Sequence, residues 1–355
     1  MKKLLALTTA LTAVGFAAQA DVTVMSWGGD YTLSQVEAYH KPFTAATGTA
    51  VISVDSDNPA PAVKAMVEAG NVTVDVADVE YADAVRLCDE GMLEPIDASV
   101  LLPAPDGTPA SEDFLPGALT ECAVSTIVFS TVFAYDTTKF PEGPTTIADF
   151  FDLEKFPGKR GMRKGAKANL EMALMADGVP AAQVYATLET PEGQDRAFAM
   201  LDKIKAETIW WEAGAQPPQL LADGEVAMTT AYNGRIFGAA VGEGKPFATV
   251  WDGQVYEYDL FVIPKGAPNA EAALEFVKFA TSTQALADQA KWISYGPARL
   301  SSGPLVGMYK DGKTEMAPFM PTAEANLGNA LSSSYEFWVD RDAELNERFQ
   351  AWLVQ

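Results

Sequence analysis

The sequence predicts an α/β protein with two lobes, each a mainly parallel sheet flanked by helices, joined by strands that cross between the lobes. Short β-prone segments alternate with amphipathic helical segments along most of the chain, which is the pattern of a doubly wound sheet. About 335 residues follow the first twenty, more than one compact core comfortably holds. Two β-prone segments, 124–135 and 256–263, are long enough to pass from one lobe into the other.

The first twenty residues have the pattern of a secretory signal peptide. Lys2 and Lys3 precede an apolar run that ends in the small-residue sequence Ala18-Gln19-Ala20, so we expect cleavage after Ala20 and export of the mature chain. The apolar run is too short to span a bilayer, and Asp21 rather than a cysteine follows it. We therefore expect neither stable membrane insertion nor a lipid anchor.

We expect the first lobe to comprise residues 21–134 and 262–320, and the second to comprise 135–261 and 321–355. The strands expected before the first crossing segment are 22–26, 51–54 and 72–79. They alternate with helices at 31–47, 61–69 and 81–90, and a surface excursion rich in Pro, Asp, Gly and Ser follows at 95–116.

The second half of the chain repeats this alternation. The expected strands are 161–163, 208–211, 226–232, 247–251 and 256–263. The expected helices are 168–176, 181–188, 192–206, 269–280, 283–292 and 335–353, of which 269–280 and 283–292 return to the first lobe.

Charge and cysteine content narrow the function classes. The formal net charge is −23, or −25 once Lys2 and Lys3 are removed, and such a surface repels nucleic acid. Cys88 and Cys122 are the only cysteines, and in an oxidising compartment we favour a disulfide between them over two free buried thiols. That crosslink would stabilise the fold by roughly 3 to 4 kcal/mol in the chain-entropy model.

Residues 224–235 contain the first candidates for a small-molecule site. Glycine ends a helix, a buried strand follows, and we expect Asn233-Gly234 to make a turn with positive φ that places Arg235 at the carboxyl end of the strand. Ligands bind at that edge of an open α/β sheet, so Tyr232 and Arg235 are candidate ligand-binding residues.

Aromatic and acidic residues at other strand ends extend the candidate site. Trp27 and Tyr31 could form aromatic walls for apolar or cationic groups, and Trp211 stands at another strand end. Glu257 and Asp259 share one face of a strand because they are two residues apart. A carboxylate in an apolar segment is costly unless paired, so Asp259 either contacts ligand or makes a buried salt bridge or backbone hydrogen bond.

Catalytic and metal-binding patterns are missing from the sequence. It has no nucleophile elbow, no phosphate loop and no Cys/His spacing for metal, so we expect no cofactor and no metal. The single histidine, His40, is expected to be solvated at a helix end. Five basic residues between Lys159 and Lys167 are interpreted as a solvated basic face.

A series of short motifs, in order over more than 250 residues, resembles the spermidine/putrescine-binding family of periplasmic solute-binding proteins from ABC importers. These motifs are Ser26-Trp27, Thr47-Gly48, Asp89-Glu90-Gly91-Met92, Phe156-Pro157-Gly158-Lys159-Arg160, Gly224-Glu225-Val226, Asn233-Gly234, Asp259-Leu260-Phe261-Val262-Ile263-Pro264 and Tyr295-Gly296-Pro297. The resemblance covers nearly all of the mature chain.

The resemblance implies a periplasmic, monomeric, two-lobed clamp of the type II kind that delivers a small amine to an inner-membrane permease. It implies that Trp27 and Tyr31 form an aromatic wall, that Glu80 lies where polar groups of the first lobe meet the amine, and that Asp259 receives an ammonium. Tyr232 and Tyr295 also match cleft aromatics of the family. A putrescine- or spermidine-type polyamine is the main expectation for the ligand.

Two departures from the family pattern favour a different ligand. Residues 165–168 lack the acidic residues with which polyamine binders hold the far amine, and Lys167 is there instead. Arg235 replaces a small residue, and a guanidinium facing the cleft would repel a diamine but clamp a carboxylate. An ω-amino acid such as 4-aminobutyrate is therefore the alternative ligand, while an enzyme or a ferric-ion binder on the same fold is a weaker one.

Overall fold

The computed structural model describes residues 21–355, and the expected signal peptide lies outside them. The first lobe begins with strand–helix alternation, as the sequence predicts. Its elements up to the first crossing strand are β1 (Val22–Ser26), α1 (Gly29–Gln35), α2 (Lys41–Thr47), β2 (Val51–Asp55), α3 (Pro59–Glu68), β3 (Val76–Glu80), α4 (Tyr81–Asp89) and α5 (Ala110–Asp113). A π-helical turn, Val36–His40, joins α1 to α2.

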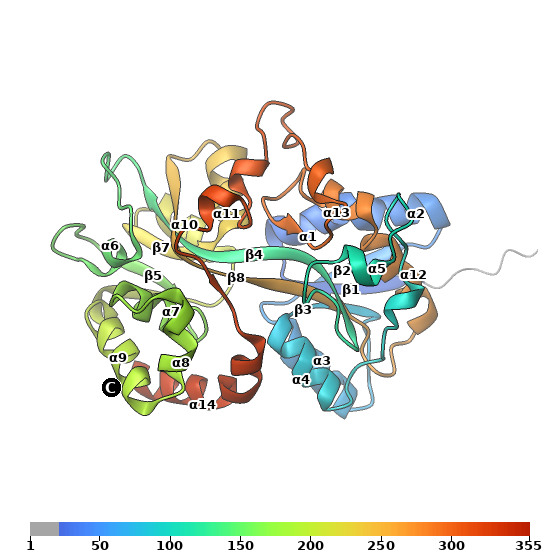
Figure 1. Cartoon of the computed structure of the whole chain (residues 1–355), viewed down its shortest axis with the longest axis horizontal. Helices are drawn as coiled ribbons and strands as arrows, with labels where there is room; N and C mark the ends of the chain where they lie inside the picture. Colours follow the sequence, from blue (N-terminus) through green and yellow to red (C-terminus); the bar gives the residue numbers. More distant parts are fainter. Residues whose placement is uncertain (1–20) are drawn as a thin grey trace, which may run out of the picture.

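The strand β4 (Ala123–Asp136) runs between the two lobes, as Figure 1 shows. The elements that follow it are α6 (Ile147–Phe151), β5 (Arg160–Arg163), α7 (Asn169–Ala176), α8 (Val184–Leu188), α9 (Pro191–Asp202), β6 (Thr208–Trp211), α10 (Gln216–Ala222), β7 (Met228–Tyr232) and α11 (Asn233–Phe237). The last elements are β8 (Phe247–Val262), α12 (Ala270–Ala280), α13 (Thr283–Gln289), β9 (Gly296–Pro297), β10 (Leu331–Ser332) and α14 (Tyr335–Leu353).

The strands of the two lobes form one continuous mixed sheet in the described residues. Its order is β2-β1-β3-β8-β4-β7-β5-β6, with β10 beside β8 and β9 beside β4. The strands β1, β2 and β3 are mutually parallel at one end, and β5, β6 and β7 are parallel at the other. The crossing strands β4 and β8 are antiparallel to each other and to their neighbours β7 and β3, so the predicted parallel arrangement holds only in the outer parts.

The strand β8 corrects one sequence expectation. We expected two separate segments, 247–251 and 256–263, but β8 is a single strand of 16 residues. Its pairing with β4 shifts register between Thr131 and Phe133, and Gly253 has φ of +76°. The residues between the two expected segments therefore form a bulge, and the strand continues across both lobes.

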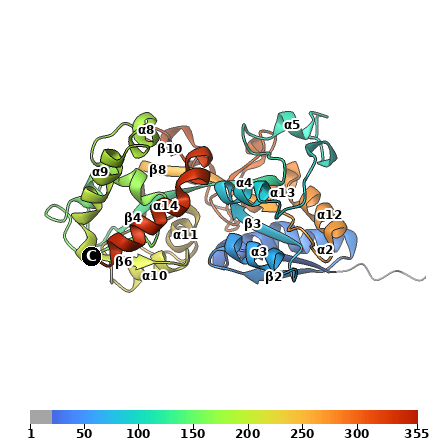
Figure 2. The ribbon, with the colours of Figure 1, turned by 90° about the horizontal axis from the view of Figure 1, so that it is seen from below.

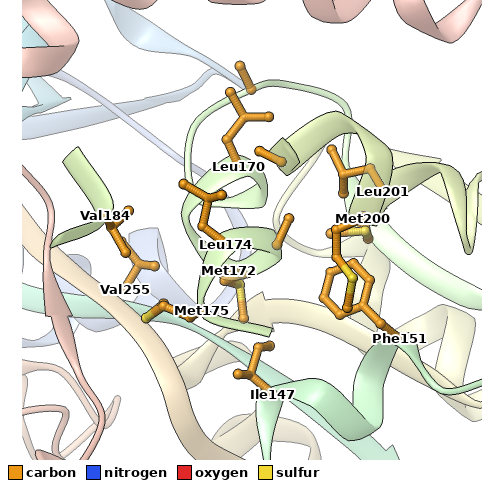
Figure 3. Packing of buried hydrophobic residues seen from close by; sticks show 14 of the residues in the cluster. Ile147, Phe151, Leu170, Met172, Leu174, Met175, Val184, Met200, Leu201 and Val255 are labelled. Carbon is orange, nitrogen blue, oxygen red and sulfur yellow. The ribbon is translucent and has the colours of Figure 1, made fainter. Parts of the chain in front are cut away.

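Two cores hold the lobes. In the second lobe, α7 packs among neighbouring helices and strands, and Figure 3 shows Leu170, Met172 and Leu174 from this helix in one cluster with Ile147, Phe151 and Leu201. In the first lobe, apolar side chains cover both faces of the β1–β3 strands. Figure 2 shows α14 lying across the second lobe, with α4 facing it from the first lobe.

The Cys88–Cys122 disulfide is present, as predicted, with the two Cα atoms 5.9 Å apart. It ties α4 to the residue just before β4, so it fixes the start of a crossing strand against the first lobe. His40 differs from its expectation, because it is buried and packs on Phe276 rather than being solvated. Burial lowers the pKa of His40 to about 4, which keeps the imidazole neutral.

Candidate ligand-binding site

Seven of the nine predicted site residues line one small cavity between the lobes. They are Trp27, Tyr31, Glu80, Tyr232, Arg235, Asp259 and Tyr295, and Phe129 completes the lining. They come from the carboxyl ends of β1, β3 and β7 and from the two crossing strands or the segments beside them. The cavity volume is about 20 Å³, room for little more than a water molecule.

The aromatic residues form a continuous wall. Tyr31 meets Tyr295 edge to face with 5.4 Å between ring centroids, and Phe129 meets Tyr232 in the same way at 5.4 Å. Phe129 also approaches Tyr295 at 6.3 Å and so connects the two pairs. Such a wall offers both apolar contact for an alkyl chain and ring faces for a cation.

Phe129 was missed by sequence analysis, because nearly every residue of β4 is buried and its pattern does not single out the residues that face the cavity. Trp211 was expected in the site but does not line the cavity. It is 2% exposed and packs edge to face behind Tyr232, with 5.7 Å between ring centroids. Its position is that of a support for Tyr232.

Asp259 is a buried carboxylate whose Oδ1 has no hydrogen-bond partner among the described residues. It lies in β8 opposite Glu80 of β3, and a bulge in β4 brings the hydroxyls of Ser125 and Thr126 to its backbone carbonyl. Burial, reinforced by Asp78 and Glu80, raises the pKa of Asp259 well above its ordinary value. The sequence left open a buried salt bridge or a backbone hydrogen bond for Asp259. Among the described residues, its Oδ1 atom makes neither.

Arg235 faces the cavity and spans the gap between the lobes. Its Nη1 donates to the carbonyl oxygen of Gly28 at 2.8 Å and its Nη2 to that of Trp27 at 3.2 Å. Its Nε is buried and has no partner in residues 21–355. Gly29 makes this approach possible, because a Cβ there would lie 2.7 Å from Nη1 and the residue has φ of +56°.

The expected turn at Asn233-Gly234 is replaced by a direct strand-to-helix transition. Tyr232 is the N-cap of α11, and neither Asn233 nor Gly234 has positive φ. Asn233 instead accepts a hydrogen bond from the backbone N–H of Ser130 and donates to the carbonyl oxygen of Ser294. Gly234 is required by packing, since a Cβ there would lie 2.6 Å from the ring of Tyr295.

Glu80 lines the cavity but is already paired with two cations from the other lobe. Arg163 Nη1 lies 2.8 Å from one of its oxygens and Lys167 Nζ lies 2.9 Å from the other. Burial opposes ionisation of Glu80, but Lys167 and Arg163 outweigh it and lower its pKa to about 2. Glu257, the ninth predicted residue, lies behind this pair and accepts a hydrogen bond from Lys167 at 2.5 Å.

These contacts correct the interpretation of residues 159–167 as a solvated basic face. Arg160 is fully buried and donates to the carbonyl oxygens of Phe150 and Phe156. Arg163 and Lys167 point into the space between the lobes, and the Lys167 side chain is 11% exposed. An excess of basic residues in an otherwise acidic chain was the sequence signal for this cluster, but only the fold brings Glu80 to it.

Comparison with known proteins places this architecture in a family. Residues 38–319 match the model of the bacterial extracellular solute-binding proteins. The chain belongs to that family. It is also similar to a gamma-aminobutyric acid-binding protein of Pseudomonas aeruginosa, with 45% identity over 346 residues that cover 98% of this chain and 94% of the relative.

Solved structures of similar proteins agree with this family assignment. The PBP MotA from A. tumefaciens B6 in complex with glucopine matches with a TM-score of 0.85 at 31% identity, over 94% of this chain and 99% of that one. The Atu4243 GABA receptor matches with a TM-score of 0.79 at 34% identity, over 94% and 97%. The solute-binding protein is thus the substrate-binding component of an ABC transporter, and it binds its solute rather than converting it.

Two further expectations concern the membrane and metals. No helix within residues 21–355 is both long and apolar enough to cross a membrane. Over the same part of the chain, the structure places no group of three or more His, Cys, Asp or Glu side chains where they could hold a metal ion.

Proposed function

We propose that this solute-binding protein captures 4-aminobutyrate, or a closely related ω-amino acid, and delivers it to an ABC permease of the inner membrane. The observation that carries the proposal is the pair of unpartnered polar groups of opposite charge in one cavity. Asp259 offers a buried carboxylate oxygen, and Arg235 offers a buried guanidinium N–H. Buried polar groups are nearly always satisfied, so such a pair favours a ligand that satisfies both.

The charge balance at the cavity supports a zwitterion over a polyamine. The cavity-lining residues with charged side chains are Glu80, Asp259 and Arg235, and Glu80 is neutralised by Lys167 and Arg163. One carboxyl group, that of Asp259, and one guanidinium, that of Arg235, therefore remain without a charged partner among the described residues. A diamine would meet only one free carboxylate, and its second ammonium would be repelled by Arg235.

The aromatic wall supports an unbranched chain between the two charges. Tyr31, Phe129, Tyr232 and Tyr295 present ring faces and edges rather than hydrogen-bonding amides, which suits a short run of methylene groups. The relatives named for gamma-aminobutyric acid and GABA favour the same ligand class.

Isothermal titration calorimetry with matched ligands tests the proposal. We expect 4-aminobutyrate to bind, and expect n-butylamine, which lacks the carboxylate, and putrescine, which replaces it with an ammonium, to bind at least tenfold more weakly. Arg235→Ala should weaken 4-aminobutyrate more than n-butylamine, because only the first ligand has a carboxylate for the guanidinium. Tighter binding of putrescine than of 4-aminobutyrate by the wild-type protein would refute the proposal.

A further inference from the structure

The cluster around Lys167 is a second arrangement of charges that the proposed ligand does not use. The Lys167 ammonium lies 2.9 Å from Glu80 and 2.5 Å from Glu257, and the three side chains are between 9% and 11% exposed. Burial alone would lower the pKa of Lys167, but Glu257 and Glu80 raise it well above its ordinary value. Lys167 is therefore a permanently charged group held inside the protein.

The backbone beside Lys167 is strained. Ala168 has φ of +66°, and it is the only non-glycine residue with positive φ in residues 21–355. A residue with a Cβ adopts this region at a cost, and such strain persists where the surrounding structure requires it. The strained residue is the N-cap of α7 and directly follows Lys167, whose side chain contacts the two carboxylates.

The strand β8 presents two carboxylates at a spacing that fits a diamine. Glu257 and Asp259 are two residues apart on the same face of β8, so their Cα atoms are roughly 7 Å apart. That separation is close to the distance between the two ammonium groups of an extended four-carbon diamine. Glu80 lies opposite Asp259 on β3 and adds a third carboxylate, which comes from the first lobe.

We propose that Lys167 is a specificity-determining residue whose ammonium occupies the place of a second ligand ammonium. It pairs with Glu257 and Glu80, so only Asp259 remains for a cation brought by the ligand. The protein thereby rejects diamines and accepts ligands with one ammonium. The inference rests on the proposed function in one respect, namely that the ligand's ammonium binds Asp259.

A neighbouring cavity provides space for the change that the inference predicts. This cavity has a volume of about 310 Å³, and Lys167, Arg163 and Glu80 lie in its wall. Glu80 also lines the ligand cavity, so the ion pair between Glu80 and Lys167 lies where the two cavities adjoin. Replacing Lys167 by a shorter side chain would remove the ammonium from this position and leave Glu257 without a cation.

Calorimetry on lysine variants with putrescine and 4-aminobutyrate tests this inference. We expect Lys167→Ala to bind putrescine at least tenfold more tightly than the wild-type protein does. Lys164→Ala is the matched control, because Lys164 precedes the same helix but forms an exposed pair with Glu212, and its putrescine affinity should equal that of the wild type. Adding Glu257→Gln to Lys167→Ala should reverse the gain, since it removes the carboxylate that was freed.

A second variant keeps the test decisive if Lys167→Ala is unstable. Lys167→Met keeps most of the side-chain volume, removes the charge, and should also raise putrescine affinity. The inference is overturned if neither variant, folded by circular dichroism, binds putrescine more tightly than the wild type. A wild-type protein that fails to bind 4-aminobutyrate would refute the proposed ligand, yet the comparison of putrescine affinities would still decide the role of Lys167.

Discussion

Replacement of Asp259 by asparagine isolates the charge that we assign to the ammonium of the ligand. The substitution keeps the shape of the side chain and removes only the carboxylate. The Oδ1 atom has no partner in the described residues, so the ionised form gains a strong interaction only when a cation arrives. Removing one member of a buried charge pair costs about 2 to 5 kcal/mol of binding free energy.

This range corresponds to an affinity for 4-aminobutyrate that is roughly 30-fold to 4,000-fold weaker. The same substitution should not lower the free energy of unfolding, although it lowers the affinity. Because the folded-state pKa of Asp259 is raised above its unfolded value, the wild-type protein loses stability as the pH rises from the unfolded pKa towards the folded one. Asparagine does not titrate, so the variant should be as stable as the wild type or more stable at neutral pH.

Calorimetry for affinity and thermal unfolding without ligand measure the two effects separately. Asp75→Asn is the matched control, since Asp75 is also buried but accepts hydrogen bonds from the backbone of Thr23 and Asn269 and does not line the cavity. It should lose stability and keep its affinity. The reasoning fails if Asp259→Asn binds 4-aminobutyrate within threefold of the wild type.

Two further predictions follow from the same contacts. Affinity for 4-aminobutyrate should rise with pH above the ordinary pKa of an aspartate, because burial raises the pKa of Asp259 and a proton bound there competes with the ammonium and is released on binding. Titrations in buffers of different ionisation enthalpy count the released proton, and a pH-independent affinity would contradict this. Gly29→Ala should weaken binding of 4-aminobutyrate about tenfold, because the added Cβ would displace Arg235. Gly48→Ala is the control: Gly48 also has positive φ, but an added Cβ would meet no atom within 4 Å, so the substitution should lower stability and leave affinity unchanged.

The sequence determined the local features of this protein. Alternating β-prone and amphipathic segments gave the order of strands and helices, and the two cysteines gave the disulfide. Residues at strand ends gave most of the cavity lining, because strand ends in an α/β sheet meet at one edge. Their role in binding a ligand stays a prediction that the proposed titrations test.

Tertiary structure decided which charges are free. Glu80 and Lys167 are 87 residues apart in the sequence, so no local sequence pattern indicates that they form an ion pair. The structure places Phe129 at the cavity and Trp211 behind Tyr232 for a similar reason, since packing across β4 and β7 decides which ring reaches the cavity. The sequence supplied every charged group of the site, but only long-range pairing left Asp259 and Arg235 without a charged partner among the described residues, because electrostatic pairing depends on distances that the chain sets by folding.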